Sequence, residues 1–215
     1  DYYLAYPEGS LSREALPLHP QYVIENGVDY AHFKFVHRAA EVPTFTRQDF
    51  DEWRFFADFA MTFRPRGVTD DKGDQLVVHG GVQAVNVGVS LGFSLAWGLD
   101  TVRGQVSVTP VNESVSDIRS MVWLMRLPGD TGDRVPESLA KRVRAANNQF
   151  LADVNIWEHQ RYTEPPGLAT AEAKGFRTVR RWATRFYPDG IKGSHPADQD
   201  AGTDDPTPDE DAPGG

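Results

Sequence analysis

Residues 74–99 read DQLVVHGGVQAVNVGVSLGFSLAWGL, and this stretch decides the fold class. Valine, leucine and aromatic residues alternate there with small or polar ones, which is the period-two pattern of half-buried strands. The pattern continues before and after it, in RFFADFAMTFRP (54–65), VRGQVSVTPV (102–111) and DIRSMVWLMRL (117–127). Residues 53–126 therefore predict a meandering antiparallel sheet of about five to seven strands.

Glycine and proline residues punctuate this region. Turn-forming segments separate the strand-like runs at residues 67–73, 80–81, 98–100 and 110–113. Gly88 and Gly92 fall inside strand-like runs, which predicts bulges or strong curvature of the sheet.

Helical periodicity flanks the sheet on both sides. A long helix is predicted from residue 136 to residue 161, because Pro136 and Glu137 suit a first helical turn. Its apolar face consists of Leu139, Val143, Ala146, Phe150, Val154 and Trp157. A second helix is predicted over residues 169–187, and residues 23–37 predict a short, irregular helical segment ahead of the sheet.

Together these elements predict an α+β fold in which a curved antiparallel sheet wraps around the long C-terminal helix. This is the helix-grip (START/Bet v1-like) arrangement. A sheet and a helix packed in this way enclose a concave apolar cavity, which is a natural site for a small molecule.

Composition narrows the classes of function. The chain has 31 acidic and 22 basic side chains, a formal net charge of −9, and no cysteine. The lack of cysteine excludes a disulfide framework and a cysteine-ligated zinc site or iron–sulfur cluster within this chain. It is compatible with the reducing cytoplasm, where we expect the protein to act. The sequence has no basic patch typical of a nucleic-acid partner and no apolar run of about eighteen residues typical of a transmembrane segment.

Three segments differ in composition. Residues 1–22 contain three prolines and predict a lead-in from a preceding domain, with one short strand. Residues 23–188 form the predicted globular domain. Residues 189–215 hold eight acidic side chains, one lysine and no aromatic residue, which predicts a disordered acidic tail. Because the chain opens with Asp1 and not with methionine, we expect it to be part of a longer protein.

Two features look out of place in an apolar cavity, and the first is Asp29-x-x-His32-x-x-x-x-His37. On a helix Asp29 and His32 share a face, whereas a continuous helix would turn His37 well away from them. A helix that breaks just before His37 would bring both imidazoles to one point. The alternative interpretation is two ordinary polar histidines at the end of a helix.

The second feature is Asp153, at the edge of the apolar face of the long helix. Buried carboxylates are paired or bind metal, so Asp153 pairs with an arginine, caps a loop, or joins the histidines. Two histidines and one distant carboxylate form the facial triad of mononuclear non-haem Fe(II) oxygenases, whose open coordination positions take O₂. A zinc hydrolase uses the same ligand types, but usually with its two histidines at i, i+4 on a regular helix.

The residues around these positions resemble a known family. The segment Glu25-Asn26-x-x-Asp29-x-x-His32-x-x-x-x-His37 is similar to the iron-site motif of Rieske non-haem iron oxygenases. A distal pattern resembles one branch of them, the oxygenase component of 3-ketosteroid 9α-hydroxylase and its sterol-oxidising relatives. That pattern comprises Phe150-x-x-Asp153-x-x-x-Trp157-Glu158, Tyr162, Pro165-Pro166 and Arg181-Trp182-x-x-x-Phe186-Tyr187. The resemblance spans residues 20–188 and implies the catalytic domain of a monooxygenase of steroid metabolism, acting in sterol catabolism and lipid degradation.

The resemblance implies a role for each candidate residue near the iron. His32, His37 and Asp153 would bind a mononuclear Fe(2+). Asp29 would orient His32 and carry electrons from the cluster of a neighbouring subunit. Asn26 would be a polar residue in the wall beside the metal.

The resemblance also implies a substrate and partners. Phe150 and Trp157 would line a cavity for a flat, steroid-like substrate, although aromatic residues at helical spacing are equally typical of core packing. The family shares the helix-grip sheet and forms homotrimers, in which one subunit's [2Fe–2S] cluster meets the next subunit's iron. Its electrons come from an NAD(P)H-dependent reductase.

One departure from the family pattern is large. The family carries an N-terminal Rieske domain that holds [2Fe–2S] with cysteine and histidine, and this chain has no cysteine. The chain is therefore the catalytic part of a longer protein, takes electrons from a separate ferredoxin-like partner, or has lost oxygenase activity. The leading hypothesis is a steroid-type hydroxylase domain. The alternatives are a non-catalytic protein of the same fold that binds a hydrophobic ligand, and a zinc-dependent hydrolase.

Overall fold

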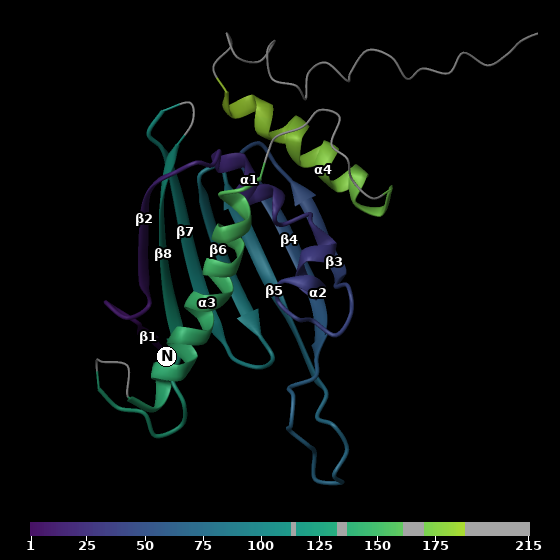
Figure 1. Ribbon diagram of the computed structural model, residues 1–215, viewed down its shortest axis with the longest axis vertical. Helices are drawn as coiled ribbons and strands as arrows, with labels where there is room; N and C mark the ends of the chain where they lie inside the picture. The colour runs from purple at the N-terminus through teal and green to yellow at the C-terminus, as the bar shows by residue number, and fades with distance from the viewer. Residues whose placement is uncertain (113–114, 133–136, 161–169, 188–215) are drawn as a thin grey trace, which may run out of the picture.

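One antiparallel sheet dominates the fold. A computed structural model describes residues 1–112, 115–132, 137–160 and 170–187 (Figure 1). The sheet has eight strands in the order β1–β8–β7–β6–β5–β4–β3, and β2 also pairs with β8. The strands are β1 (Tyr2–Leu4), β2 (Ser10–Leu16), β3 (Thr44–Phe50), β4 (Arg54–Phe63), β5 (Val78–Val87), β6 (Leu91–Trp97), β7 (Val102–Pro110) and β8 (Ser116–Met125).

The helices of the described residues accompany this sheet on one side. They are α1 (Pro20–Glu25), α2 (Tyr30–Phe35), α3 (Ala140–Trp157) and α4 (Thr170–Ala183), with 3₁₀ turns at Glu137–Leu139 and Thr184–Phe186. The long helix α3 runs along one face of the sheet, and α4 lies near α1 at one end of it (Figure 1). The predicted α+β helix-grip fold is confirmed.

Strand alternation separates the two faces of the sheet. In β4, Phe55, Ala57 and Phe59 are buried, whereas Phe56 and Asp58 between them are only partly buried. Successive side chains of a strand point to opposite faces, so the buried set defines the inner face toward the helices. The other set defines the outer face.

Apolar contacts hold α3 against the inner face. Val154 and Trp157 of α3 pack with Val108 of β7 and Ile118 of β8. A neighbouring cluster joins Leu139 and Val143 to Tyr3, Val122 and Leu124. Each fully buried side chain of this kind stabilises the fold by about 1.5–3 kcal/mol, so the rotation of α3 about its axis is firmly determined.

The helix α4 packs on the opposite half of the inner face. Phe176, Val179 and Trp182 join Phe55 and Ala57 of β4 in one buried cluster. The indole N–H of Trp182 also donates a 2.8 Å hydrogen bond to the carbonyl oxygen of Asp51. This hydrogen bond ties α4 to the turn between β3 and β4.

The sheet is larger than the sequence pattern predicts. Residues 1–22, which we predicted to be a lead-in with one short strand, supply β1 and β2 and the start of α1. Both strands pair with β8, so this segment belongs to the domain. The strand β3 also precedes the predicted start of the sheet at residue 53.

Two glycine predictions were wrong. Gly80 and Gly81, predicted as a turn, lie inside β5. A Cβ on Gly81 would stand 2.9 Å from the Trp97 ring, so the absence of a side chain allows close packing of neighbouring strands. Gly88, which we placed inside a strand as a sign of a bulge or of strong curvature, has φ of 57° and lies beyond the end of β5, where a turn needs that conformation.

Some predictions lie outside the described residues. These are the start of the long helix at Pro136, its end at Arg161, and the acidic tail 189–215. Among the helices that the structure does describe, none combines the length and the apolar character required to cross a lipid bilayer.

Candidate metal centre

A break between two short helices positions the histidines. Asp29 caps the N-terminus of α2, where its carboxylate accepts a hydrogen bond of 3.2 Å from the backbone N–H of His32. The helix ends at Phe35, so His37 follows it in a turn. The predicted break just before His37 is therefore present, and the imidazole centroids of His32 and His37 are only 5.0 Å apart.

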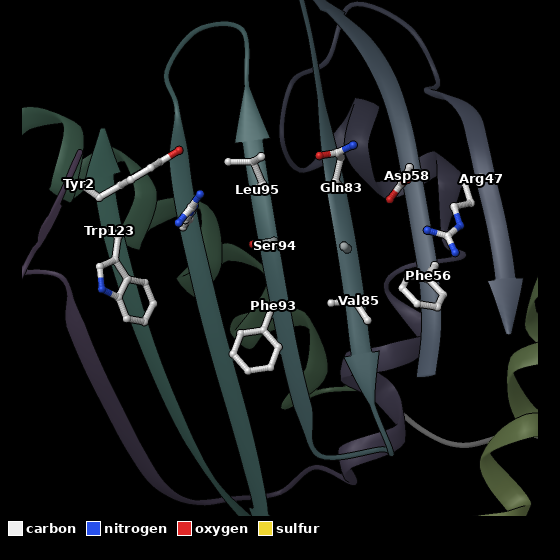
Figure 2. Close-up of a pocket in the computed structure, with 12 residues that line it drawn as sticks. Tyr2, Arg47, Phe56, Asp58, Gln83, Val85, Phe93, Ser94, Leu95 and Trp123 are labelled. Atoms are coloured by element: carbon white, nitrogen blue, oxygen red, sulfur yellow. The ribbon is translucent and has the colours of Figure 1, made fainter. Parts of the chain in front are cut away.

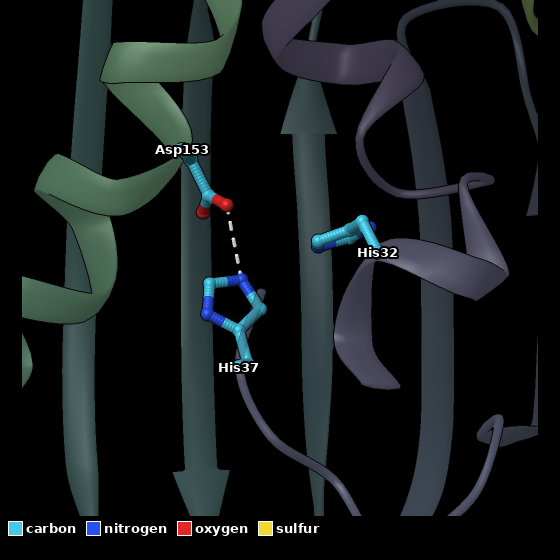
Figure 3. Close-up of side chains that lie close together, drawn as sticks. All are labelled: His32, His37 and Asp153. Atoms are coloured by element: carbon cyan, nitrogen blue, oxygen red, sulfur yellow. Dashed lines mark ion pairs between the residues drawn. The ribbon is translucent and has the colours of Figure 1, made fainter. Parts of the chain in front are cut away.

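The long helix contributes the carboxylate. Asp153 is buried on α3 next to Val154, whose packing on the sheet directs this part of the helix inward. One ligand atom each from His32, His37 and Asp153 can be chosen so that all three lie within 4.8 Å of one another. Figure 3 shows the three side chains converging from α2, the following turn and α3.

The polar atoms at this point fit a bound cation. Nε2 of His32 is buried and has no hydrogen-bond partner among the described residues, whereas the buried Oδ1 of Asp153 is in contact with Nε2 of His37. Leaving a buried polar atom unpaired costs about 1–3 kcal/mol, so such atoms in a native site call for a ligand. Two imidazoles and one carboxylate are a donor set suited to a divalent transition metal.

One distance also agrees with shared coordination. Nε2 of His37 lies 3.0 Å from Oδ1 of Asp153 (Figure 3). Two ligands at right angles about an ion, with bonds of about 2.1 Å, would be separated by about 3.0 Å. The pair is thus at the spacing of adjacent ligands.

Each imidazole is oriented by a contact of its other nitrogen. Nδ1 of His32 lies 2.5 Å from the backbone carbonyl oxygen of Asp29. Nδ1 of His37 lies 2.7 Å from Oε1 of Gln149 on α3. Both acceptors favour a proton on Nδ1, which leaves the lone pair of each Nε2 free to bind a metal.

The two imidazoles differ in their electrostatics. Burial lowers the pKa of His32, and it outweighs the charges of Asp153 and Asp29, which act in the opposite direction. Burial also lowers the pKa of His37, but the adjacent Asp153 carboxylate and the contact with Gln149 outweigh it and leave the pKa raised above the ordinary value. The metal-free site therefore holds its proton on His37 more readily than on His32.

Asp29 and Asn26 lie beside His32. They line a small crevice of about 30 Å³ together with Glu25 and Trp157. A space of this size has room for solvent beside His32. The Asp29 carboxylate is half-buried and lies 3.9 Å from Nδ1 of His32.

Phe150 and Trp157 lie in the core cluster under α3. Trp157 is buried, Phe150 is half-buried, and their ring centroids are 6.0 Å apart. These positions agree with the interpretation that both aromatic side chains serve core packing. A role in binding substrate stays a prediction.

Two features of the site were missed in the sequence. Gln149 is one helical turn before Asp153, so helical spacing could have identified it as a neighbour of the site. The other is a buried ion pair between Glu25 of α1 and Arg180 of α4, with Nε and Oε1 2.8 Å apart. Glu25 also accepts a 2.7 Å hydrogen bond from Gln21, and no local pattern indicates that Arg180 is its partner.

Comparisons with known proteins identify the family and the fold. A family model described as the 3-ketosteroid 9alpha-hydroxylase C-terminal domain matches residues 4–187. No curated protein matches the chain in sequence.

Solved structures show a similar fold at low identity. One is a quaternary ammonium Rieske monooxygenase, described for carnitine oxidation by gut microbiota and inter-subunit electron transfer. It has 12% identity and a TM-score of 0.54 over 85% of this chain and 51% of that chain. Another is the quaternary ammonium Rieske monooxygenase CntA with an inhibitor, with 12% identity and a TM-score of 0.52 over 74% of this chain and 39% of that chain. The chain thus spans about half the length of these structures or less.

Proposed function

This chain belongs to the 3-ketosteroid 9alpha-hydroxylase C-terminal domain family, a family of Rieske-type oxygenase catalytic domains, and from this premise we propose that it hydroxylates a steroid or a similar polycyclic apolar substrate with O₂. The observation that carries the proposal is the convergence of His32, His37 and Asp153 on one buried point. These residues come from separate elements, and the unpaired, buried Nε2 of His32 lies with the His37 imidazole and the Asp153 carboxylate, which together are the donor types of a mononuclear iron site.

The proposed roles follow from the contacts of each residue. His32 and His37 would bind the metal through Nε2, and Asp153 through its carboxylate. An Fe(2+) ion bound there would supply the one-electron redox chemistry by which O₂ is activated. Asp29 would keep His32 in its orientation, both through its carbonyl oxygen and by capping α2.

The crevice lined by Asn26 and Asp29 suggests where an electron donor would bind next to the metal site. The half-buried Asp29 carboxylate lies between solvent and His32, so a redox partner docked there would approach the metal through this residue. We propose that electrons come from a [2Fe–2S] cluster outside this chain, reduced by an NAD(P)H-dependent reductase in the cytoplasm. In a homotrimer the cluster would belong to the neighbouring subunit.

The inner face of the sheet offers a surface for a flat substrate. Cross-strand neighbours Ala84, Ser94 and Gly104 form one row on the inner face, in register with the buried Ala57. All three are small and only half-buried, in contrast to the large buried side chains at the ends of the sheet. We propose that the substrate lies over this row, with Phe150 and Trp157 on the helix side, where apolar walls would exclude water.

The test is the iron content after anaerobic reconstitution with Fe(II). We expect about one iron per chain in the wild type, in line with a single triad. Asp153→Ala and His37→Ala should lose it. Glu158→Ala is a matched control, because it removes a carboxylate from the residue that caps the end of the same helix and lies outside the triad.

The outcomes separate the proposal from its alternatives. Full iron occupancy in Asp153→Ala would refute the ligand assignment. Iron that binds normally, without hydroxylation of any steroid when a competent electron donor is supplied, would refute the proposed activity and retain the metal site. Hydrolysis that requires zinc and proceeds without O₂ would establish the hydrolase in its place.

A further inference from the structure

The outward side of α4 carries a charge pattern that the metal centre does not use. The opposite side of this helix packs in a buried apolar cluster with β4 and α1 (Figure 1). Among the described residues of α4, the exposed side chains are Lys174, Arg177, Thr178 and Arg181. The three cations follow one another at spacings of three and four positions, so they lie in one row along the helix. We call this row the basic stripe.

The positive charge of the basic stripe is not balanced by its neighbours. None of its three cations forms an ion pair with any residue that the structure describes. Like charges three and four positions apart destabilise a helix. Burial of the opposite side holds α4 in place despite this repulsion. A negatively charged group laid along the basic stripe would relieve it.

Acidic side chains on and under α4 are engaged elsewhere. Glu172 of α4 accepts a 2.9 Å hydrogen bond from the backbone N–H of Ala31 in α2. Glu25 of α1 is paired with Arg180, on the buried side of α4. Neither carboxylate is therefore available to the outward side.

The charge pattern changes just beyond the end of α4. Arg185 lies next to the turn between β3 and β4, where its guanidinium donates hydrogen bonds to the backbone carbonyl oxygens of Asp51 and Glu52. The Asp51 carboxylate is paired with Arg54, and Glu52 is exposed beside it. Acidic and basic groups are thus mixed at this end, and the unbalanced charge lies on the basic stripe itself.

The chain supplies a segment of opposite charge directly after this helix. Residues 189–215 hold eight acidic side chains and one lysine, which is most of the net charge of −9. Asp189 follows Tyr187, the last described residue, by two positions, and the next acids are Asp198 and Asp200. An extended chain covers up to about 3.3 Å per residue, whereas a helix rises by about 1.5 Å per residue. These acids can therefore reach every cation of the basic stripe.

We propose that the basic stripe is the docking site of this acidic segment, residues 189–215, of the same chain. Its carboxylates pair with the ammonium group of Lys174 and with the guanidinium groups of Arg177 and Arg181. Tethering favours this occupant over a separate acidic partner, because a short link holds the acids near the stripe at an effective concentration on the order of millimolar. The segment of a second copy has the same charges without that advantage.

A second uncovered surface fits the acidic segment less well. Figure 2 shows side chains that project from the face of the sheet opposite the helices, around a hollow of about 580 Å³. The lining is mainly aromatic and aliphatic, and Arg47 and Arg103 share it with Asp58. Residues 189–215 contain no aromatic residue and eight acids. They match a purely cationic row better than a largely apolar face of mixed charge.

The test is a distance measurement within the full chain by double electron–electron resonance. The chain has no cysteine, so spin labels can be placed selectively in Thr178→Cys/Ala201→Cys, one beside the basic stripe and one in the acidic segment. A free segment of the fourteen residues from Tyr187 to Ala201 would have a root-mean-square span of about 20 Å, and docking should narrow the spread of distances to about half of this or less. Adding Lys174→Glu/Arg177→Glu should restore the broad spread.

A matched control separates the basic stripe from net charge. Lys141→Glu/Arg144→Glu also reverses an exposed lysine and an exposed arginine three positions apart on a helix, in this case α3. It should leave the narrow distribution unchanged. Circular dichroism and iron content should be the same in all variants, so the result is independent of the metal centre.

The outcomes decide between occupants. A broad distribution in the labelled chain before any charge reversal would overturn the proposal and leave the basic stripe free for a separate acidic partner. Equal broadening by both charge reversals would also overturn it. A narrow distribution that is lost on dilution with unlabelled chain would assign the stripe to the acidic segment of a second copy and overturn docking within one chain.

Discussion

Gln149 offers a sharp test of how the candidate metal centre is built. Its amide oxygen lies 2.7 Å from Nδ1 of His37, and it stands one turn before Asp153 on the same helix. One helix thus supplies a proposed ligand and the group that orients another. Replacing Gln149 by Leu removes the acceptor and keeps the helix, because leucine has a high helix propensity.

The expected magnitude follows from the exposure of this contact. Loss of a group that orients a metal-bound histidine typically lowers metal affinity by about 10–100-fold. Gln149 is exposed, so water can replace its oxygen and reduce the loss. We therefore expect Gln149→Leu to weaken Fe(II) binding by about tenfold, which corresponds to about 1.4 kcal/mol. Gln149→Glu retains an acceptor and should bind iron at least as well as the wild type.

The assay is an anaerobic titration with Fe(II) in which the quenching of tryptophan fluorescence reports binding. The titration is repeated with Co(II), whose absorption spectrum reports the geometry of the ligands. Asn148→Leu is the matched control, because Asn148 is exposed at the adjacent position of α3. Gln149→Leu should change the Co(II) spectrum, and Asn148→Leu should not. Equal Fe(II) affinity in Gln149→Leu and the wild type would show that His37 is oriented without this hydrogen bond.

Two further predictions concern stability and pH. Arg180→Met leaves the carboxylate of Glu25, which is 1% exposed, buried without a positive partner. Urea unfolding should therefore show a free energy of unfolding lower by about 3–5 kcal/mol, and Glu25→Gln/Arg180→Met should recover much of this loss. A decrease below about 1 kcal/mol would contradict a buried ion pair. Because the pKa of His37 is raised, protons compete with the metal for its imidazole. Fe(II) affinity should therefore fall as pH is lowered through that pKa. An affinity that is constant between about pH 6 and pH 8 would argue against His37 as a ligand. In the metal-free protein the sign is opposite: the contact of protonated His37 with Asp153 stabilises the fold at low pH, and this contribution is lost as pH rises through the raised pKa.

Local patterns in the sequence determined much of this protein. The alternation in residues 74–99 predicted strands, and the apolar spacing from Leu139 to Trp157 predicted the long helix. The spacing of His32 and His37 required a helix break, which the structure contains. These predictions succeed because helix and strand periodicity depend on residues a few positions apart.

The tertiary structure alone decided the long-range pairings. Nothing near residues 1–22 indicates that two strands there pair with β8, and nothing near Arg180 identifies Glu25 as its partner. A slip of one residue in any strand would turn its side chains to the other face. The sequence by itself determined the elements and the candidate ligands, whereas their meeting at one buried point depended on how the whole chain packs.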